Sequence, residues 1–302
     1  MKINKPKELV VISGKGGTGK TSITAALAQC FSTKVLADCD VDAADLHLLM
    51  KVKSYKEYPF IAGHIAQIHE EKCQKCGLCA TLCRFDAITQ TDDLYKISKR
   101  SCEGCKVCVD ACPNKAIEWI ESQTGVWKET YTEQGLMFHA RLFPGAENSG
   151  KLVSHVREKA KQYAVSNQIP LILVDGPPGI GCPVIASVTG ASAVLIVTEP
   201  TPSGHHDLER ILSLTKHFKI PAYVIINKAD LSDEFCTRIQ ETSEQFNSIV
   251  VGKISYNSLF TEAQLLGKSI LEVFPDSNES KTIKSIANVM SHKMELQISR
   301  ND

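Results

Sequence analysis

The feature that most restricts the fold of this chain is a glycine-rich loop near its beginning, residues 14–21, with the sequence GKGGTGKT. It satisfies the pattern G-x-x-x-x-G-K-[ST] and lies between a β-rich run at residues 7–13 and a stretch with helical spacing at residues 19–31. In that context the glycines let backbone N–H groups curl around a phosphate, and the helix N-terminus adds its dipole. The loop predicts a nucleotide site in which Lys20 bridges the β- and γ-phosphates and the Thr21 hydroxyl binds Mg²⁺.

The rest of the chain repeats the alternation of strand and helix that begins at this loop. Apolar runs at residues 34–37, 170–174, 193–198, 222–226 and 249–254 alternate with helical patterns at residues 149–165, 203–218, 232–246 and 258–266. Continuous apolar strands between helices indicate a parallel sheet that is covered on both faces. We therefore expect an α/β fold with a doubly wound, mostly parallel sheet.

Composition excludes some classes of partner. The formal net charge is zero, which gives no sign of nucleic-acid binding, and no apolar run reaches the ~18 residues of a membrane span. A final helix with apolar residues at 283, 286, 290 and 294 is expected to pack on the core, with a membrane-binding helix as the alternative. The first apolar run is too short for a signal peptide, so we expect a cytoplasmic protein.

An internal repeat interrupts the alternation between residues 58 and 118. Residues 72–88 and 101–117 superpose at an offset of 29 positions, and every cysteine and a following Ala-Ile pair have counterparts. This predicts an inserted module at 58–118 between two parts of the main domain, 1–57 and 119–302. From residue 117 to residue 142, alternating residues around 124–125 suggest a hairpin that leads back to the main domain.

A second lysine inside the phosphate loop, Lys15, gives the sequence K-G-G-T-G-K. This resembles the deviant Walker A motif of the MinD/Mrp/nitrogenase-iron-protein group of P-loop ATPases. The resemblance implies a dimer, formed with an identical chain or a sister ATPase, in which Lys15 reaches the nucleotide of the other subunit. The alternative is a solvated loop lysine.

The resemblance extends along the chain. Asp38-Cys39-Asp40 looks like the D-x-D of the group, in which the second acid, here Asp40, positions the attacking water. Residues 174–179 resemble the Walker B and switch II segment, which implies that Asp175 holds a metal-bound water and that Gly179 donates its N–H to the γ-phosphate. A helix N-cap is the alternative for Asp175. By this resemblance the catalytic residues are Lys15, Lys20, Asp40 and Asp175.

The residues expected to bind MgATP lie in two segments. Those of the phosphate loop are Gly14, Gly16, Gly17, Thr18, Gly19, Lys20, Thr21 and Ser22. The second segment, N-K-A-D, contains Asn227, which in the group binds the adenine edge. The same motif reads guanine in GTPases, with Asp230 accepting from the base. The resemblance favours ATP, and the sequence leaves GTP open.

The two cysteine runs match the bacterial two-cluster ferredoxin pattern, C-x₂-C-x₂-C-x₃-C. In that pattern the fourth cysteine of each run ligates the other cluster, which implies two [4Fe–4S] clusters in an α+β ferredoxin-like module. The implied ligand sets are Cys73, Cys76, Cys79 and Cys112 for one cluster, and Cys102, Cys105, Cys108 and Cys83 for the other. Zinc is the competing metal. Arg84 stands where the pattern usually has proline.

Four cysteines lie outside these runs. Cys30, Cys39 and Cys236 are expected to be small buried residues. Cys182 lies seven residues after Asp175, at an offset that resembles one ligand of the cluster shared between nitrogenase iron protein subunits. A second such cysteine is missing, so a metal role for Cys182 is a minor hypothesis. His205 and His206 are interpreted as residues of a helix's first turn.

These patterns support one main hypothesis and two alternatives. The main hypothesis is an ATPase in which nucleotide-driven rearrangement of a dimer is coupled to electron transfer from two clusters to a redox or metallocluster partner. The first alternative is an iron–sulfur or mixed-metal cluster carrier of the Mrp kind. The second is a positional switch like the cell-division ATPases of the group, without a nucleic-acid or membrane partner.

Overall fold

The computed structural model describes residues 5–296 of the chain, which divides into two compact units. The large unit contains the residues up to Glu57, Trp127–Arg141 and the residues from Ser149 onward. The small unit contains Tyr58–Val126 and Leu142–Asn148. Two long strands, β3 (Val52–Ile68) and β6 (Ile117–Thr132), continue through the boundary between the units.

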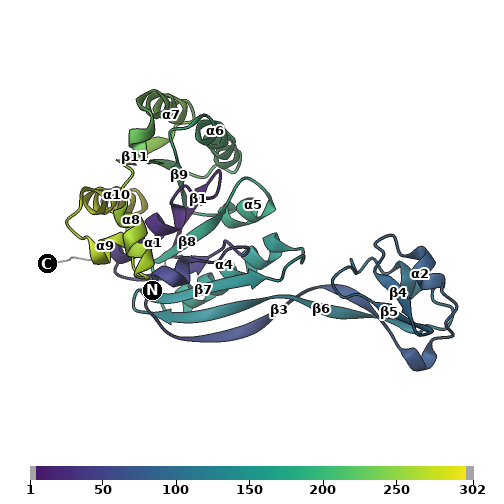
Figure 1. Cartoon of the computed structure of the whole chain (residues 1–302). Coiled ribbons are helices and arrows are strands. Elements are labelled where there is room, and N and C mark those ends of the chain that lie inside the picture. Colours follow the sequence, from purple (N-terminus) through teal and green to yellow (C-terminus); the bar gives the residue numbers. More distant parts are fainter. Residues whose placement is uncertain (1–4, 297–302) are drawn as a thin grey trace. The chain divides into compact units, whose positions relative to one another are not determined.

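A nine-stranded sheet has the order β11-β10-β9-β1-β8-β2-β7-β6-β3 (Figure 1). Strand pairs from β11 to β7 are parallel, with β1 between β9 and β8 and β2 between β8 and β7. The strands of this parallel part are β1 (Lys7–Ser13), β2 (Lys34–Asp38), β7 (Gly135–Leu142), β8 (Leu171–Pro178), β9 (Ala193–Thr198), β10 (Ala222–Asn227) and β11 (Ile249–Ile254). The expected mostly parallel α/β sheet is confirmed.

Helices cover this sheet and bury both of its faces. Their bounds are α1 (Lys20–Cys30), α4 (Ser149–Ser166), α5 (Cys182–Val188), α6 (Pro202–His217), α7 (Asp233–Gln245), α8 (Leu259–Leu265), α9 (Ile270–Val273) and α10 (Asn278–Met294). Side chains of α1 and α10, such as Ile23 and Ile286, pack with Leu9 and Val11 of β1 in one core cluster. Val10 and Ile12 of β1 alternate with them and are also fully buried.

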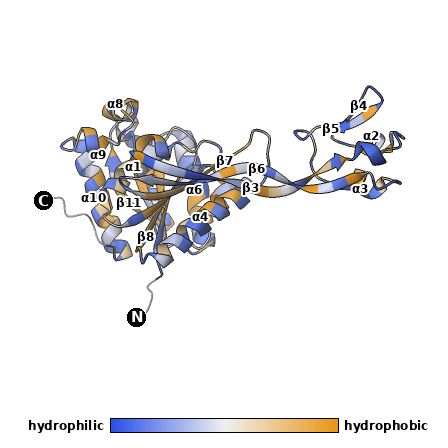
Figure 2. Cartoon of the chain, turned by 90° about the horizontal axis from the view of Figure 1, so that it is seen from below, coloured by the Kyte–Doolittle hydropathy of each residue, from blue (hydrophilic) through white to orange (hydrophobic). Residues whose placement is uncertain are grey.

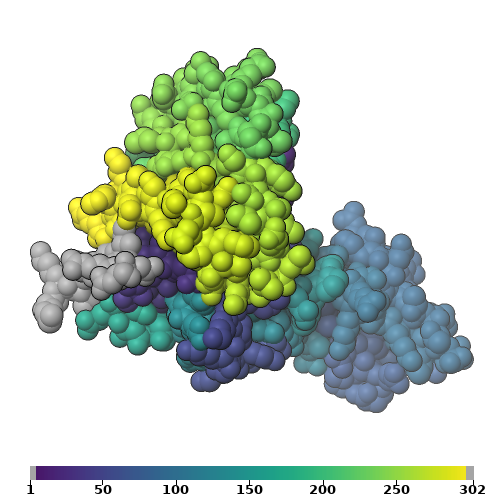
Figure 3. Space-filling view, turned by 60° about the vertical axis from the view of Figure 1, so that its left-hand side comes forward, coloured from purple at the N-terminus to yellow at the C-terminus, as the bar shows by residue number. Residues whose placement is uncertain are grey.

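The final helix is part of this core. Ile283, Ile286 and Met290 are each 0% exposed, and Met294 is 5% exposed. Figure 2 shows the contrast between the apolar strands and the more polar outer parts of the helices, and Figure 3 shows the C-terminal segments as one continuous yellow surface on the large unit. The prediction that this helix packs on the core is confirmed. No helix within residues 5–296 combines the length and apolar character needed to cross a membrane.

The hairpin expected over residues 117–142 is present as β6 and β7, but its turn does not lie at residues 124–125. β6 runs without a break through Thr124 and Gly125, and the chain turns at residues 133–134, where the Gln134 N–H donates to Thr132 Oγ1. Since two residues separate β6 from its sheet neighbour β7, these strands run antiparallel. Thr132 Oγ1 also donates to the Gly135 carbonyl at 2.7 Å, so the Thr132 hydroxyl bridges the two ends of the turn.

The small unit contains two short helices, α2 (Leu78–Leu82) and α3 (Val107–Ala111), and an antiparallel pair, β4 (Ile88–Thr91) and β5 (Leu94–Ile97). Short 3₁₀ turns, η1 (Leu46–Leu49), η2 (Glu70–Lys72) and η3 (Ala229–Leu231), complete the elements of the chain. The sequence did not predict β3, whose residues 52–57 are exposed and carry no apolar run.

The backbone of the small unit repeats at the same offset of 29 residues as its sequence. Left-handed residues occur in pairs: Lys75 with Gly104, Gly77 with Lys106, and Asp86 with Lys115. Gly77 and Lys106 each cap their short helix, and their carbonyls accept the equivalent N–H groups of Thr81 and Asp110. A left-handed conformation is costly for lysine and aspartate, so its recurrence shows that both halves of the repeat adopt one chain path.

Candidate nucleotide site and cysteine sites

A cavity of about 680 Å³ lies at the carboxyl end of the parallel strands, over the loop that joins β1 to α1. This volume is within the range of small-molecule sites. Among the residues proposed from the sequence, the walls include Gly16, Gly17, Thr18, Gly19, Lys20, Thr21, Ser22, Asp40 and Asn227. The phosphate loop and the D-x-D segment therefore share one cavity.

Three carboxylates surround Lys20 at the floor of this site. Lys20 Nζ lies 2.9 Å from Asp175 Oδ1 and 3.8 Å from Asp40 Oδ2, and the lysine side chain is 6% exposed. Burial alone would lower the pKa of Lys20, but the charges of Asp175, Asp38 and Asp40 outweigh it and raise the pKa. Lys20 is therefore a fixed positive charge with three acidic neighbours.

The two acids of the D-x-D segment have different environments. Asp38 is fully buried and accepts N–H bonds from Asp40 and Leu46, at 3.1 and 3.0 Å. Burial and the nearby Asp175 raise the pKa of Asp38 well above its usual value. Asp40 lines the cavity, and burial raises its pKa to about 6 although Lys20 opposes the shift. Asp38 thus shapes the turn, and Asp40 is the acid that can contact a ligand.

The residues expected to hold Mg²⁺ lie together. Thr21 Oγ1 donates to Asp175 Oδ2 at 2.7 Å, and Thr24 Oγ1 donates to Asp175 Oδ1 at 3.0 Å. A hydroxyl and a carboxylate are ligands that Mg²⁺ accepts, directly or through water. Thr18 is 2% exposed, and its Oγ1 lacks a hydrogen-bond partner in the described structure although it belongs to the phosphate loop. This oxygen and the Thr21–Asp175 pair fit a bound magnesium nucleotide.

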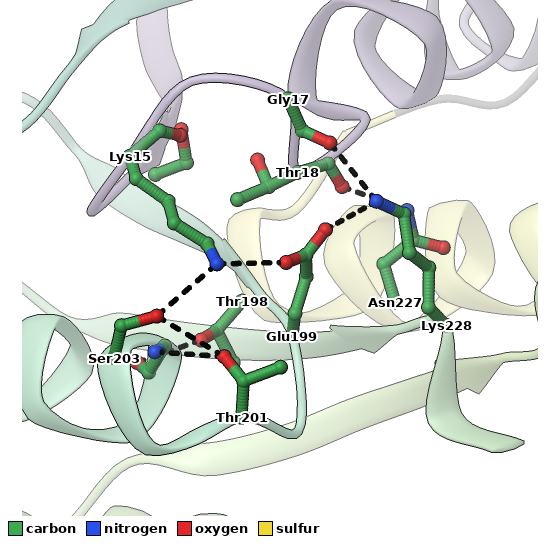
Figure 4. Close-up of polar contacts among 11 residues, drawn as sticks. Lys15, Gly17, Thr18, Thr198, Glu199, Thr201, Ser203, Asn227 and Lys228 are labelled. Carbon is green, nitrogen blue, oxygen red and sulfur yellow. Dashed lines mark hydrogen bonds and ion pairs between the residues drawn. The ribbon is translucent and has the colours of Figure 1, made fainter. Parts of the chain in front are cut away.

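Lys15 lies away from its own cavity and is not among the residues of its wall. Its Nζ lies 3.0 Å from Oε2 of Glu199, the residue just after β9 (Figure 4). It also lies 3.2 Å from Oγ of Ser203, in the first turn of α6. Glu199 also pairs with Lys228, whose Nζ donates to the Gly17 carbonyl at 3.1 Å. The sequence analysis did not find Glu199 and Lys228, because an acid after a strand gives no signal of its own.

The N-K-A-D segment divides its polar groups between two tasks. Asn227 Nδ2 donates to the Thr18 carbonyl at 2.7 Å, which ties the end of β10 to the phosphate loop. Asp230 does not line the cavity, and its Oδ1 accepts the N–H of Tyr256 at 2.5 Å. In this arrangement Asp230 holds a wall loop rather than facing a base.

The far wall of the cavity comes from residues that the sequence analysis missed. They are Ser255, Tyr256, Asn257, Phe260, Thr261 and Gln264. Gln264 of α8 donates to Ser22 Oγ at 2.6 Å and so joins this wall to α1. A polar loop followed by a short amphipathic helix has no motif that distinguishes it from an ordinary connection.

In the small unit, Cys73, Cys76, Cys79 and Cys112 line one cavity. Three of them come from the first run and the fourth from the second run, as the ferredoxin pattern implies. Pro113 and Ile117 are among the other residues of its wall, and the Cys112 sulfur accepts the Ala116 N–H at 3.3 Å. A thiol-lined cavity with apolar walls fits an iron–sulfur cluster.

The second set has equivalent positions on the repeated backbone. Cys102, Cys105 and Cys108 surround the start of α3 as Cys73, Cys76 and Cys79 surround the start of α2. Burial raises the pKa of the Cys108 thiol to about 11, and Cys102 and Cys105 are close enough to add to it. Within residues 5–296, no three His, Cys, Asp or Glu side chains converge on a point that suits a single metal ion. Each cysteine of a cubane cluster binds a different iron, so its ligands surround a volume instead.

Comparison with known protein families agrees with the nucleotide site. Residues 9–270 match the family model described as the CobQ/CobB/MinD/ParA nucleotide binding domain. The chain belongs to this family. It is therefore a P-loop nucleotide-binding protein, as its phosphate loop predicts.

Relatives of the chain extend this result. An uncharacterized protein of Methanocaldococcus jannaschii, MJ0578, is 33% identical over 92% of this chain and 94% of its own length. An uncharacterized ferredoxin of the same organism, MJ0265, is 30% identical over 95 residues, 31% of this chain and 55% of that protein. The septum site-determining protein MinD of Pyrococcus horikoshii, solved with Mg-ADP, has a TM-score of 0.57 at 16% identity, covering 94% of this chain and 96% of that one. At that identity the structure shows a shared MinD/ParA fold.

The segment after β8, which resembles switch II of the family, is hydrogen-bonded to the end of β1. The Gly179 N–H, expected at a γ-phosphate, donates to the Ser13 carbonyl at 2.8 Å. Gly179 has a φ of 90°, a conformation that favours glycine. In this structure the Gly179 N–H is therefore already bonded to β1.

The remaining cysteines and histidines separate into buried and exposed positions. Cys30, Cys39 and Cys236 are buried, which confirms their interpretation as core residues. Cys182 is exposed at the start of α5. His205 and His206 lie in the first turns of α6, where His205 Nε2 is 2.8 Å from Thr242 Oγ1.

Proposed function

We propose that this chain hydrolyses MgATP and carries two [4Fe–4S] clusters, so that nucleotide-driven rearrangement of a pair of chains is coupled to electron transfer to a partner protein. The observation that carries the proposal is the cavity lined by Cys73, Cys76, Cys79 and Cys112 in a chain that also has a complete phosphate loop. The clusters, when bound, supply one-electron storage and transfer. The inserted segment, proposed at 58–118, is the ferredoxin-like module that holds them.

Lys20 is poised to exchange one partner for another when nucleotide enters. In the described structure its ammonium group pairs with Asp175 at 2.9 Å. A bound triphosphate offers a denser negative charge, and Mg²⁺ can then take the place of Lys20 at Asp175 and Thr21. Lys20 would stabilise charge on the phosphoryl group during transfer.

Asp40 is the acid best placed to orient the attacking water. It lies on the cavity wall 3.8 Å from Lys20, whereas Asp38 is buried behind it and already accepts two backbone N–H bonds. A pKa of about 6 leaves Asp40 ionised at neutral pH. Asp40 can therefore accept a hydrogen bond from water in the form in which the enzyme works.

The substrate is proposed to be ATP rather than GTP. Reading guanine requires a carboxylate that faces the base, but Asp230 is committed to the Tyr256 N–H and lies outside the cavity wall. Asn227 lines the cavity and keeps Oδ1 for the base edge while Nδ2 holds the phosphate loop. The Mg-ADP of the MinD structure supports the same nucleotide class.

The trans role of Lys15 belongs to the same proposal. Lys15 has a side chain that is 35% exposed, and it does not line its own cavity. A phosphate-loop lysine that does not line its own cavity is suited to contact the phosphates of a nucleotide bound to a second chain. Pairing with an identical chain or a sister ATPase would then complete the site.

A cluster carrier is the second candidate, and Cys182 is the observation that favours it. This cysteine is exposed at the start of α5, four residues after the end of β8. A carrier needs an exposed, releasable cluster, whereas the ferredoxin pattern gives each cluster of the small unit four cysteine ligands within one module, which suits electron transfer. The similarity of the fold to MinD keeps a positional switch as a third candidate. A positional switch does not explain the eight cysteines of the two repeated runs.

Anaerobic purification followed by iron, sulfide and zinc analysis and an ATPase assay tests the proposal. About eight iron and eight sulfide per chain are expected, as two cubane clusters require, together with Mg²⁺-dependent hydrolysis of ATP. Zinc in place of iron, or no affinity for purine triphosphates, would contradict the proposal. Iron that is lost when only Cys182 is replaced by serine would favour the carrier.

A further inference from the structure

The carboxylate of Glu199 forms ion pairs with two lysines from different parts of the chain, next to the phosphate loop (Figure 4). Its side chain is 8% exposed and contacts Lys15 of the loop and Lys228 at the end of β10. Burial alone would raise the pKa of Glu199, but hydrogen bonds from Lys228 and Lys15 outweigh it and hold the pKa below its usual value. Glu199 is therefore a stable anion that both lysines share.

The surrounding residues fix the backbone that carries this carboxylate. Thr201 caps α6 by accepting the Gly204 N–H at 3.1 Å, and Thr198 Oγ1 donates to the Gly204 carbonyl at 3.0 Å. A side chain on Gly204 would lie 2.3 Å from the Glu199 carbonyl oxygen, so the first turn of α6 packs directly on the Glu199 backbone. Because its backbone is held in this way, Glu199 cannot follow Lys15 far if the lysine moves to a second chain.

The second lysine lets the first one leave at little cost. An isolated buried carboxylate is strongly destabilising, so a simple ion pair of Lys15 and Glu199 would resist separation. Lys228 remains on Glu199 when Lys15 departs, and it also donates to the Gly17 carbonyl at 3.1 Å. The loop backbone thus stays attached while the Lys15 side chain becomes free.

We infer that Glu199 is a positioning residue that holds Lys15 within its own chain until a second nucleotide-bound chain draws the lysine across. This inference rests on the proposed pairing of two chains. It names Glu199 as the group that opposes pairing by holding Lys15. The competition is between one carboxylate, already neutralised by Lys228, and the phosphates of a partner's nucleotide. Glu199 then sets the protein concentration at which chains pair in the presence of ATP.

Two substitutions should shift this concentration in opposite directions. Glu199→Gln removes the charge that holds Lys15, so the concentration for half-maximal pairing should fall about three- to fivefold, the range for a partly exposed ion pair. Lys228→Met leaves Glu199 to Lys15 alone and frees the Gly17 carbonyl, so that concentration should rise. Glu199→Asp keeps the charge and should stay near the wild-type value.

Sedimentation of the holoprotein with ATP, in an Asp40→Ala background that prevents turnover, measures the pairing. Ser203→Ala is the matched control, because it removes the neutral contact of Lys15 and leaves the ion pair. It should change the pairing concentration less than Glu199→Gln does. In a Lys15→Ala background, Glu199→Gln should have no effect on pairing.

The outcomes separate this inference from the function on which it rests. If the Asp40→Ala protein without further substitutions never pairs in the presence of ATP, the paired-chain function fails. If it pairs but Glu199→Gln pairs at the same or a higher concentration, the function stands and the role of Glu199 is overturned. If Glu199→Gln does not fold, the sign of the Lys228→Met shift decides, because a decrease contradicts the competition for Glu199.

Discussion

The two units of this chain differ in what holds them together. The large unit has a continuous core of side chains from β1, α1 and α10, many of them with no exposed surface. In the small unit neither α2 nor α3 has a buried residue, and all eight cysteines of the two runs are at least partly exposed. A unit of this size has a small core and is only marginally stable on apolar burial alone. The large unit is therefore stabilised by its own side chains, and we propose that the small unit gains much of its stability from bound clusters.

The largest expected effect separates the two units chemically. Lys20→Ala removes the ammonium group that meets the transferring phosphoryl group, so hydrolysis should fall by about a thousandfold or more. The iron content and the brown colour of the small unit should stay unchanged, because Lys20 contacts only large-unit residues among the described contacts. A phosphate-release assay and iron analysis of the same sample check both parts, and loss of the chromophore in this variant would break the separation.

Removing iron should unfold the small unit alone. Chelation under reducing conditions takes away the groups that four cysteines per site would bind, and residues 58–126 should then become open to proteases. The large unit keeps its core, so it should stay folded and should still bind ADP. Limited proteolysis with mass spectrometry, together with calorimetry of ADP binding, gives the measurement. Small-unit protection that survives complete iron removal would show that the unit does not depend on clusters.

The pH dependence of hydrolysis sharpens the account of the large unit. The pKa of Asp40 is about 6, and its carboxylate is the form that orients water. Protonation increases as pH falls through this value, so kcat/KM for MgATP should decrease about tenfold per pH unit below about 6. Rates from pH 5 to 8 test this in the wild type. Asp40→Asn should be inactive across the range, and a wild-type profile that is flat from 5 to 7 would remove Asp40 from the role.

The smallest expected effect concerns the wall loop of the nucleotide cavity. Asp230→Asn removes the charge from the hydrogen bond to the Tyr256 N–H, which weakens the hold on the wall loop. The KM for ATP should rise a few-fold, as expected when one charge-assisted hydrogen bond is weakened at a site open to water. The kcat should change little. Preference for ATP over GTP should stay the same. A switch in base preference would show that Asp230 faces the base after all.

The fold of the large unit was predictable because its signals are local and periodic. The strand at 193–198 was predicted with its observed bounds, and the loop at 14–21 has a motif with a physical mechanism. The strand β3 was missed, because residues such as Lys53 and Lys56 lie on an exposed edge that needs no apolar pattern. The turn after β6 was misplaced because Thr124-Gly125 resembles a turn more than Glu133-Gln134 does.

The candidate site was predictable where chemistry and spacing coincide, and not elsewhere. Lys20, Asp40 and Thr21 were named and lie in one cavity. Glu199 and Gln264 were not named, because their importance comes from contacts 184 and 242 residues away, with Lys15 and Ser22 respectively. Such contacts depend on the order of strands in the sheet, which a single sequence does not show.

The central claim is that a nucleotide site and two iron–sulfur clusters on one chain influence each other. The most direct test is a redox titration of the anaerobic holoprotein, followed by electron paramagnetic resonance, with and without a non-hydrolysable ATP analogue. The account predicts reducible [4Fe–4S] signals whose midpoint potential or line shape changes when the analogue binds to the wild type, and does not change in Lys20→Ala. Identical titrations in all samples, or an absence of such signals, would contradict it.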